Sequence, residues 1–286
     1  EILKSGSRRL LSNSYETNNF HYKKFKYSTF KALPYANFET DAGFTMGAEA
    51  VWTKYGLVNN PFQAQHELLA NYYFATNGFS VRYNAEFAHL FYNWNFGITA
   101  RYTSPNYFLN YFGSGSETEY DPSEVNKDYN RMRIQKWHFS PALIWRNNAG
   151  SIFDIRTSLE SFKVKYEPET FLGEILSPEN DIFDQQVYAG AEANYRFYSK
   201  NRKAFPSLGS DVRVTGGYKK SIDGAGNEFG YLEPSVSFNY PLISSGYAVF
   251  ATKVGGEVIF GEDYEIYHAA AIGGNRSLRG YRNHRF

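Results

Sequence analysis

Residues 79–103 read FSVRYNAEFAHLFYNWNFGITARYT, and their alternation is the clearest indication of the fold. From Phe79 to Phe91 every second residue is aromatic, aliphatic or histidine, whereas polar residues such as Arg82 and Glu86 occur at the positions between. After a tight two-residue connection the alternation resumes at Trp94. Because successive side chains of a strand point to opposite faces, this pattern predicts two β-strands joined by a hairpin, each with one apolar face.

The same alternation recurs along the chain and predicts an all-β protein. About eleven strands are expected, at residues 33–40, 44–55, 65–74, 79–91, 94–103, 130–145, 151–164, 183–199, 208–219, 229–240 and 247–260. Pro141 and Pro234 fall inside two of these ranges, and each removes a backbone donor. Several strands exceed the ~5–6 residues common in soluble sheets and approach the ~9–11 that a tilted membrane strand needs. We therefore favour a transmembrane antiparallel β-barrel over a soluble β-sandwich or lipocalin-like barrel.

The links between the expected strands differ in length according to whether they follow an even-numbered or an odd-numbered strand. After even-numbered strands they are short or middling, at 56–64, 92–93, 146–150, 200–207 and 241–246. After odd-numbered strands the first two are tight and the later ones are long, at 104–129, 165–182, 220–228 and from 261 onward. Short turns on one rim and long loops on the other are typical of outer-membrane barrels.

A membrane barrel also assigns a face to each residue. The set expected to face lipid is Val81, Ala189 and Val214, and the set expected to face the lumen is Arg82, Glu86, Glu192 and Arg213. Aromatic residues near the strand ends fit two interfacial girdles, namely Trp52, Tyr55, Phe74, Trp94, Tyr102, Trp145, Tyr240 and Phe260.

Composition excludes several other classes of protein. Aromatic residues make up 19% of the 286 residues, and no cysteine occurs, so a disulfide framework and a thiolate metal site are excluded. The 30 basic and 29 acidic residues nearly balance, which does not favour nucleic acid as a partner. The six histidines have no metal-ligand spacing, and neither a Gly-x-Ser-x-Gly elbow nor a P-loop occurs. We expect no catalytic residue, metal or cofactor in this chain.

One motif follows the eleventh expected strand. Residues 272–281 read IGGNRSLRGY, and the glycine pair followed by Arg-Gly-Tyr resembles the signature in the sixth surface loop of the BamA/TamA-type superfamily, also called the bacterial surface antigen family. The resemblance implies a sixteen-stranded barrel in the full protein, in which this loop joins strands eleven and twelve. It also implies that the motif residues fold back into the lumen: Gly273, Gly274, Arg279, Gly280 and Tyr281.

By the same resemblance, the motif arginine meets an acidic residue on the inner wall. The usual partner in the family lies on a strand beyond Phe286, so within this chain the carboxylates to consider are Glu192, Glu233 and Glu257. A confined guanidinium needs such a partner, and its planar fork suits a carboxylate.

A second resemblance covers the front of the chain. Residues 25–30 (FKYSTF), 33–35 (LPY), 41–44 (DAGF) and 105–118 look like Bacteroidota members of this superfamily, some of which carry an upstream metallophosphoesterase domain. The metal-binding motifs of that domain do not occur here, since Asn283-His284 lacks both the preceding glycine and the following acid.

These observations give a provisional layout. Residues 1–32 are expected to be a periplasmic linker and barrel entry, preceded by further sequence, and residues 33–286 an incomplete barrel that ends in the sixth surface loop. The expected location is the bacterial outer membrane. The expected role is protein insertion or translocation, with membrane lipid, client polypeptides and accessory periplasmic or lipoprotein subunits as partners. The alternatives are a display barrel for a fused phosphoesterase domain and, third, a passive porin.

Overall fold

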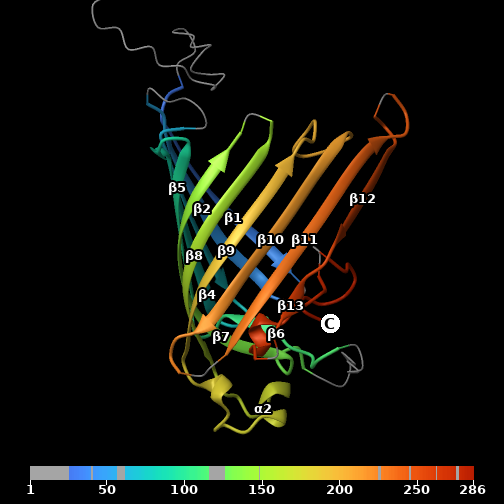
Figure 1. The fold of residues 1–286 in the computed structure, drawn as a ribbon. Coiled ribbons are helices and arrows are strands. Elements are labelled where there is room, and N and C mark those ends of the chain that lie inside the picture. Colours follow the sequence, from blue (N-terminus) through green and yellow to red (C-terminus); the bar gives the residue numbers. More distant parts are fainter. Residues whose placement is uncertain are drawn as a thin grey trace, which may run out of the picture.

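A single antiparallel sheet dominates the chain. The computed structural model describes residues 26–39, 41–56, 62–115, 126–147, 149–224, 227–244, 246–261, 263–274 and 277–286. Within these ranges 13 strands form one sheet, in the order β1-β2-β3-β4-β5-β7-β8-β9-β10-β11-β12, with β6 beside β7 and β13 beside β11. Figure 1 shows the sheet curling into a tall wall of tilted strands. The expected all-β class, with sequential neighbours paired antiparallel, is confirmed.

The strands match the alternation pattern closely. Their bounds are β1 Thr29–Glu39, β2 Gly43–Lys54, β3 Ala64–Tyr73, β4 Gly78–Phe91, β5 Trp94–Thr103, β6 Phe108–Asn110, β7 Arg131–Arg146, β8 Ser151–Val164, β9 Gln186–Tyr198, β10 Gly209–Ser221, β11 Glu228–Pro241, β12 Val249–Gly255 and β13 Val258–Phe260. The first strand begins at Thr29 rather than Leu33, inside the expected entry segment, whose residues 1–25 lie outside the described ranges. The short strand β6 was not expected, and the eleventh expected strand is divided into β12 and β13.

Proline explains two interruptions of the ladder. Gly256 donates its backbone N–H to the carbonyl of Pro234 at 3.1 Å, but Pro234 has no N–H to return. The register is the same on both sides of this gap, since Ser235 pairs with Gly255 and Leu232 with Val258. At Pro141 the β7–β8 ladder is likewise interrupted. Both strands nevertheless form, because each proline removes only one donor.

The two faces of the sheet differ as predicted. On β8 the inward Glu160 is 3% exposed, whereas the outward neighbour Leu159 is 50% exposed. The cross-strand register carries this parity along the wall and places the expected lumen set, Arg82, Glu86, Glu192 and Arg213, on the face of Glu160. The expected lipid set, Val81, Ala189 and Val214, lies on the opposite face.

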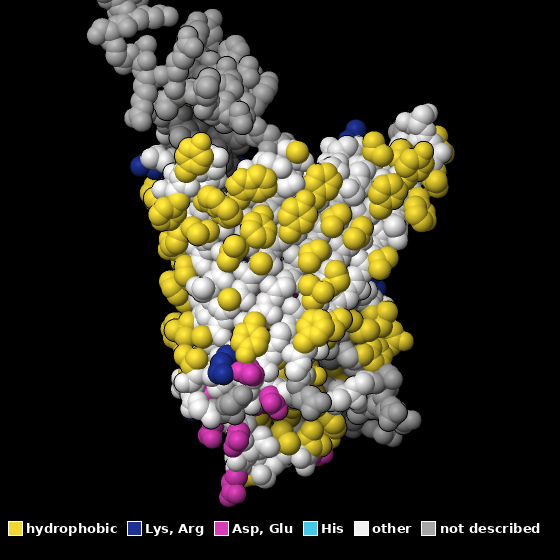
Figure 2. Space-filling view, viewed as in Figure 1, with side chains coloured by type: hydrophobic (Ala, Val, Ile, Leu, Met, Phe, Trp, Pro, Cys, Tyr) yellow, Lys and Arg dark blue, Asp and Glu magenta, His cyan; other side chains and the backbone are white. Residues whose placement is uncertain are grey.

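Outward aromatic side chains form two bands. Four strands carry an aromatic pair eight residues apart, at 44 and 52, 79 and 87, 94 and 102, and 137 and 145. At ~3.3 Å per residue and a tilt of ~40°, eight residues span about 20 Å of height, close to the ~25 Å apolar band of outer-membrane barrels. Within one band the ring of Tyr102 lies 5.6 Å from Phe79 and 4.3 Å from Trp137. Figure 2 shows hydrophobic side chains gathered towards both ends of the wall.

The two rims also differ. The rim with the N-terminal strand start carries short turns, whereas the other carries the longer links, with β6, the helix α2 (Phe171–Ile175) and the 3-10 turns η1 (Asp181–Phe183) and η2 (Ile266–His268) (Figure 1). At this long-loop rim an apolar cluster joins strand ends to the links, and its buried members are Met132, Ile134, Phe162, Val164, Leu172, Ile182, Phe183, Tyr188 and Phe229. Among the described residues, no helix has the length and apolar character to cross a membrane.

Candidate functional site at the long-loop rim

The motif segment forms a closed loop. The backbones of Ile272 and Phe286 exchange two hydrogen bonds, of 2.7 and 3.1 Å, and Gly274 donates to the carbonyl of Tyr281 at 3.1 Å. The two arms of the segment therefore run side by side, and the Arg-Gly-Tyr residues lie near the end of the loop. Figure 1 shows this chain end beside β13, at the height of the long-loop rim. Asn275 and Arg276 of the motif lie outside the described residues.

The three motif glycines, Gly273, Gly274 and Gly280, all have positive φ angles that the shape of this loop requires. Gly273 has φ +142°, and a Cβ there would lie 2.2 Å from the carbonyl oxygen of Arg282, which no side chain can accommodate. Gly280 has φ +95°, with open space around it, so its requirement is conformational. A substitution at Gly273 would separate the two arms of the loop.

A buried ion pair attaches the closed loop to the first hairpin of the sheet. Asp41 lies in the turn between β1 and β2, and its Oδ1 accepts from Nε of Arg282 at 2.5 Å. Its Oδ2 accepts from the backbone N–H of Asn283 at 2.9 Å. The side chain of Asp41 is 6% exposed and that of Arg282 is 10% exposed. Both carboxylate oxygens thus bind the same short segment of the loop.

The strand β6 completes this attachment. The side-chain amide of Asn110, the last residue of β6, donates to the carbonyl of Asn283 at 3.0 Å and accepts from Arg282 at 3.2 Å. The guanidinium of Arg282 also lies over the ring of Phe112, 5.1 Å from its centroid. From the other side, Arg131 donates to the backbone carbonyl of Asp41. We call Asp41, Asn110, Arg282 and Asn283 the rim junction.

The rim junction specifies position more than it adds stability. Removing two charges from water is costly, and a buried pair often adds little compared with well-packed apolar groups. Removing only one partner, however, leaves an uncompensated buried charge. The arrangement therefore penalises any state in which the closed loop leaves the β1–β2 turn.

The predicted motif residues lie close to the rim junction. The Arg279 side chain is exposed, and among the described residues it forms no hydrogen bond or ion pair, so its pairing with an inner-wall carboxylate stays a prediction. Tyr281 is 52% exposed, with its ring 5.2 Å from that of Phe286. Of the three carboxylates considered for Arg279, Glu192 already accepts from Asn194 at 2.6 Å and lies 3.4 Å from Nε of Arg156.

No local pattern in the sequence predicts the rim junction. In the sequence, Asp41 belongs to a tight turn and to the resemblance segment 41–44, and Arg282 is the residue after the motif; neither position indicates the other as a partner. They lie 241 positions apart. Their pairing depends on how far the C-terminal segment reaches across the rim, which alternation and motif spacing do not specify.

The turn η2 places a histidine in an aromatic pocket. Ring centroids of Phe162, Tyr188, Phe229 and Tyr267 lie between 4.7 and 5.0 Å from that of His268. Among the described residues neither ring nitrogen has a hydrogen-bond partner. Burial lowers the pKa of His268 to about 3, and the nearby Lys219 and Lys136 act in the same direction while Glu160 opposes them. The imidazole is therefore neutral at ordinary pH.

Next to this pocket, on the inner face of the strands, charged side chains pair with one another. Glu160 on β8 lies 3.0 Å from Lys136, 2.6 Å from His138 and 2.7 Å from Lys219. Lys219 comes from β10 and reaches across β9, where Gly190 leaves room for its side chain: a Cβ there would lie 3.1 Å from Cγ of Lys219. This arrangement of paired charges is suited to an aqueous interior.

Fold, faces and rims together define a transmembrane antiparallel β-barrel wall. No family model and no curated protein sequence matches the chain. Among solved structures, the fold is similar to the crystal structure of BamA from Haemophilus ducreyi lacking POTRA domains 1–3, with a TM-score of 0.61 and 18% sequence identity. The similarity covers 89% of this chain and 45% of that one, so this chain spans less than half the length of that BamA chain. At this identity the similarity concerns the fold.

Proposed function

We propose that this chain is part of an outer-membrane barrel that inserts or translocates other polypeptides. The observation that carries the proposal is the C-terminal closed loop, which turns back at the long-loop rim and is tied to the β1–β2 turn by Arg282 and Asp41. A simple diffusion pore has no need for a loop fixed to its first hairpin. The BamA-like course of the sheet supports the same role.

The proposed activity needs no covalent chemistry. The apolar outer face would contact lipid, and the paired charges of the inner wall would line a hydrated interior. Client polypeptides and accessory periplasmic or lipoprotein subunits would act at the rims or along the wall. In this role Arg279 would pair with an inner-wall carboxylate, which fixes the position of the loop tip.

The second candidate is a display barrel for an upstream phosphoesterase domain, of the kind that the Bacteroidota resemblance of the front segment implies. The observation that favours this candidate is the position of two of the resemblance segments, around Asp41–Phe44 and Pro105–Asn110. Both lie at the long-loop rim. In that case the barrel would serve as an anchor, and the rim junction would only stabilise it.

Controlled depletion of the full-length protein in its own cell separates these functions. An insertion role predicts that folded outer-membrane barrels decline while their unfolded precursors accumulate. A display role predicts normal barrels with loss of surface phosphoesterase activity. A porin role predicts reduced uptake of small solutes alone. Unchanged levels of folded barrels after depletion would refute the proposal.

A further inference from the structure

The short-turn rim carries a basic turn. Residues 199–208 connect β9 to β10 and include Lys200, Arg202 and Lys203. In the described parts of the short-turn links there is no aspartate or glutamate, so these described links supply no carboxylate to neutralise the three cations. The long-loop link between β8 and β9, in contrast, contains Glu167, Glu169, Glu174, Glu179, Asp181 and Asp184. Figure 2 shows small groups of Lys or Arg atoms at the upper edge, whereas the acidic atoms gather at the lower end, beside a further Lys or Arg group.

Hydrogen bonds hold the basic turn in one shape. The side-chain oxygen of Asn201 accepts from the backbone N–H groups of Ser207 and Leu208, at 3.1 and 3.2 Å. The backbone N–H of Asn201 donates to the carbonyl of Leu208 at 3.0 Å. Asn239 at the end of β11 donates to the carbonyl of Pro206 at 3.1 Å. The three cations are therefore presented from a defined turn that is fixed to the neighbouring strand.

Large apolar side chains accompany the cations. Phe205, in the same turn, is 83% exposed. In the next turn, between β11 and β12, Leu242 is 65% and Tyr247 is 95% exposed. The two turns are neighbours, since a Cβ on Gly246 would lie 3.8 Å from Ser207. Exposed aromatic and aliphatic side chains next to cations suit the boundary between headgroups and acyl chains, where one end of the contact is wet and the other apolar.

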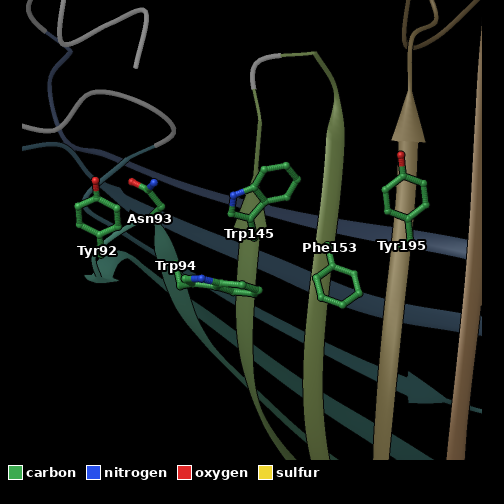
Figure 3. Close-up of a pocket in the computed structure, with 6 residues that line it drawn as sticks. All are labelled: Tyr92, Asn93, Trp94, Trp145, Phe153 and Tyr195. Atoms are coloured by element: carbon green, nitrogen blue, oxygen red, sulfur yellow. The ribbon is translucent and has the colours of Figure 1, made fainter. Parts of the chain in front are cut away.

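An apolar groove opens on the outer face near the same turn. Its volume is about 530 Å³, and its lining residues are Tyr92, Asn93, Trp94, Trp145, Phe153 and Tyr195. Figure 3 shows the rings of Trp94, Trp145, Phe153 and Tyr195 spread across four neighbouring strands. Tyr195 lies on β9, which runs directly into the basic turn. The groove therefore lies on the outer face of strands that end at the short-turn rim, and β9 connects it to the basic turn.

We propose that the basic turn and the groove together bind an anionic phospholipid of the leaflet at the short-turn rim. The headgroup phosphate would contact Lys200, Arg202 and Lys203, and an acyl chain would lie along the groove. The inference rests on the membrane location that the proposed function assumes. Charge decides the occupant: a zwitterionic lipid gains little from three unneutralised cations, whereas an anionic headgroup gains from each of them.

The test uses the full-length protein in phosphatidylethanolamine nanodiscs that contain a minority of phosphatidylglycerol. After partial delipidation, native mass spectrometry counts the two lipids that remain bound. We expect phosphatidylglycerol to be retained in preference by about fivefold for each cation that contacts its phosphate. The preference should fall as salt is added. An excess of inorganic phosphate should not replace the bound phosphatidylglycerol. Equal retention of the two lipids by the wild-type protein would overturn the proposal.

Variants locate the site. The triple substitution Lys200→Gln, Arg202→Gln and Lys203→Gln should abolish the preference. The control, Lys163→Gln with Lys220→Gln, removes two exposed cations near the other rim and should preserve the preference. A preference that survives the triple substitution would refute the location. If the wild-type protein shows no lipid preference and the triple variant loses a co-purifying periplasmic protein, the turn is a protein-docking surface and the proposal is refuted. If the wild-type protein inserts clients but shows no lipid preference, only this inference is refuted. If it shows the lipid preference but does not insert clients, only the proposed function is refuted.

Discussion

Substituting Arg282 by alanine tests the rim junction most sharply. The change leaves the carboxylate of Asp41 buried, with the N–H of Asn283 as its remaining described donor. Breaking a buried pair from one side costs roughly 3–5 kcal/mol, and the retained hydrogen bond places the expected cost at the low end, about 3 kcal/mol. Because each ~1.4 kcal/mol is a factor of ten, the closed loop should detach about a hundredfold more often.

Hydrogen exchange followed by mass spectrometry on the full-length protein measures this detachment. Peptides that cover residues 277–286 should lose about a hundredfold of their protection in Arg282→Ala, and Asp41→Asn should act in the same direction. The double variant should cost less than the sum of the two, because it removes both charges. The control Lys165→Ala breaks an exposed ion pair with Glu167 at the same rim, and should change protection by less than about fivefold. Equal protection in Arg282→Ala and Lys165→Ala would refute the reasoning.

Three further outcomes are expected. Ala189→Arg places a charge on the outer face at a cost of roughly 2–4 kcal/mol, so it should lower the yield of heat-modifiable barrel on gels, whereas Asn194→Arg on the inner face should not; the reverse order would invert the assignment of faces. Arg279→Ala in the full-length protein should leave the barrel inserted but lower its unfolding temperature, and an unchanged temperature would count against the predicted pairing. Because the pKa of His268 falls from 6.5 to about 3, its contribution to stability should be complete above pH 6.5 and lost as the pH falls towards 3, by about 5 kcal/mol at most. His268→Phe should remove this acid sensitivity. Hydrogen exchange of residues 263–274, corrected for the pH dependence of the intrinsic exchange rates, measures it, and equal acid sensitivity in both proteins would contradict the prediction.

The long strands could be predicted because their physics is local. On β9 the polar residues at 192, 194 and 196 point inward and the small or aromatic residues at 193, 195 and 197 point outward, so the sequence alone assigns both the strand and its faces. Even Pro141 and Pro234 did not prevent prediction, because one missing donor does not change the side-chain period.

The elements at the long-loop rim could not be predicted in the same way. The strand β6 has 3 residues and the helix α2 has 5, too few to establish a period. Each depends on contacts with other parts of the chain: β6 pairs with β7, and Leu172 of α2 packs into the apolar cluster. The motif glycines could be identified by resemblance, but the residue that reaches a described carboxylate, Arg282, lies just outside the motif.

Reconstitution tests the proposed insertion activity most directly. The full-length protein, together with its co-purified subunits, is placed in lipid vesicles, and a urea-unfolded outer-membrane barrel is added. Folding of that client is followed by its change in gel mobility before and after heating. Client folding should be faster than in protein-free vesicles, and slower with Arg282→Ala than with Lys165→Ala. A client folding rate equal to that of protein-free vesicles would contradict the proposed function.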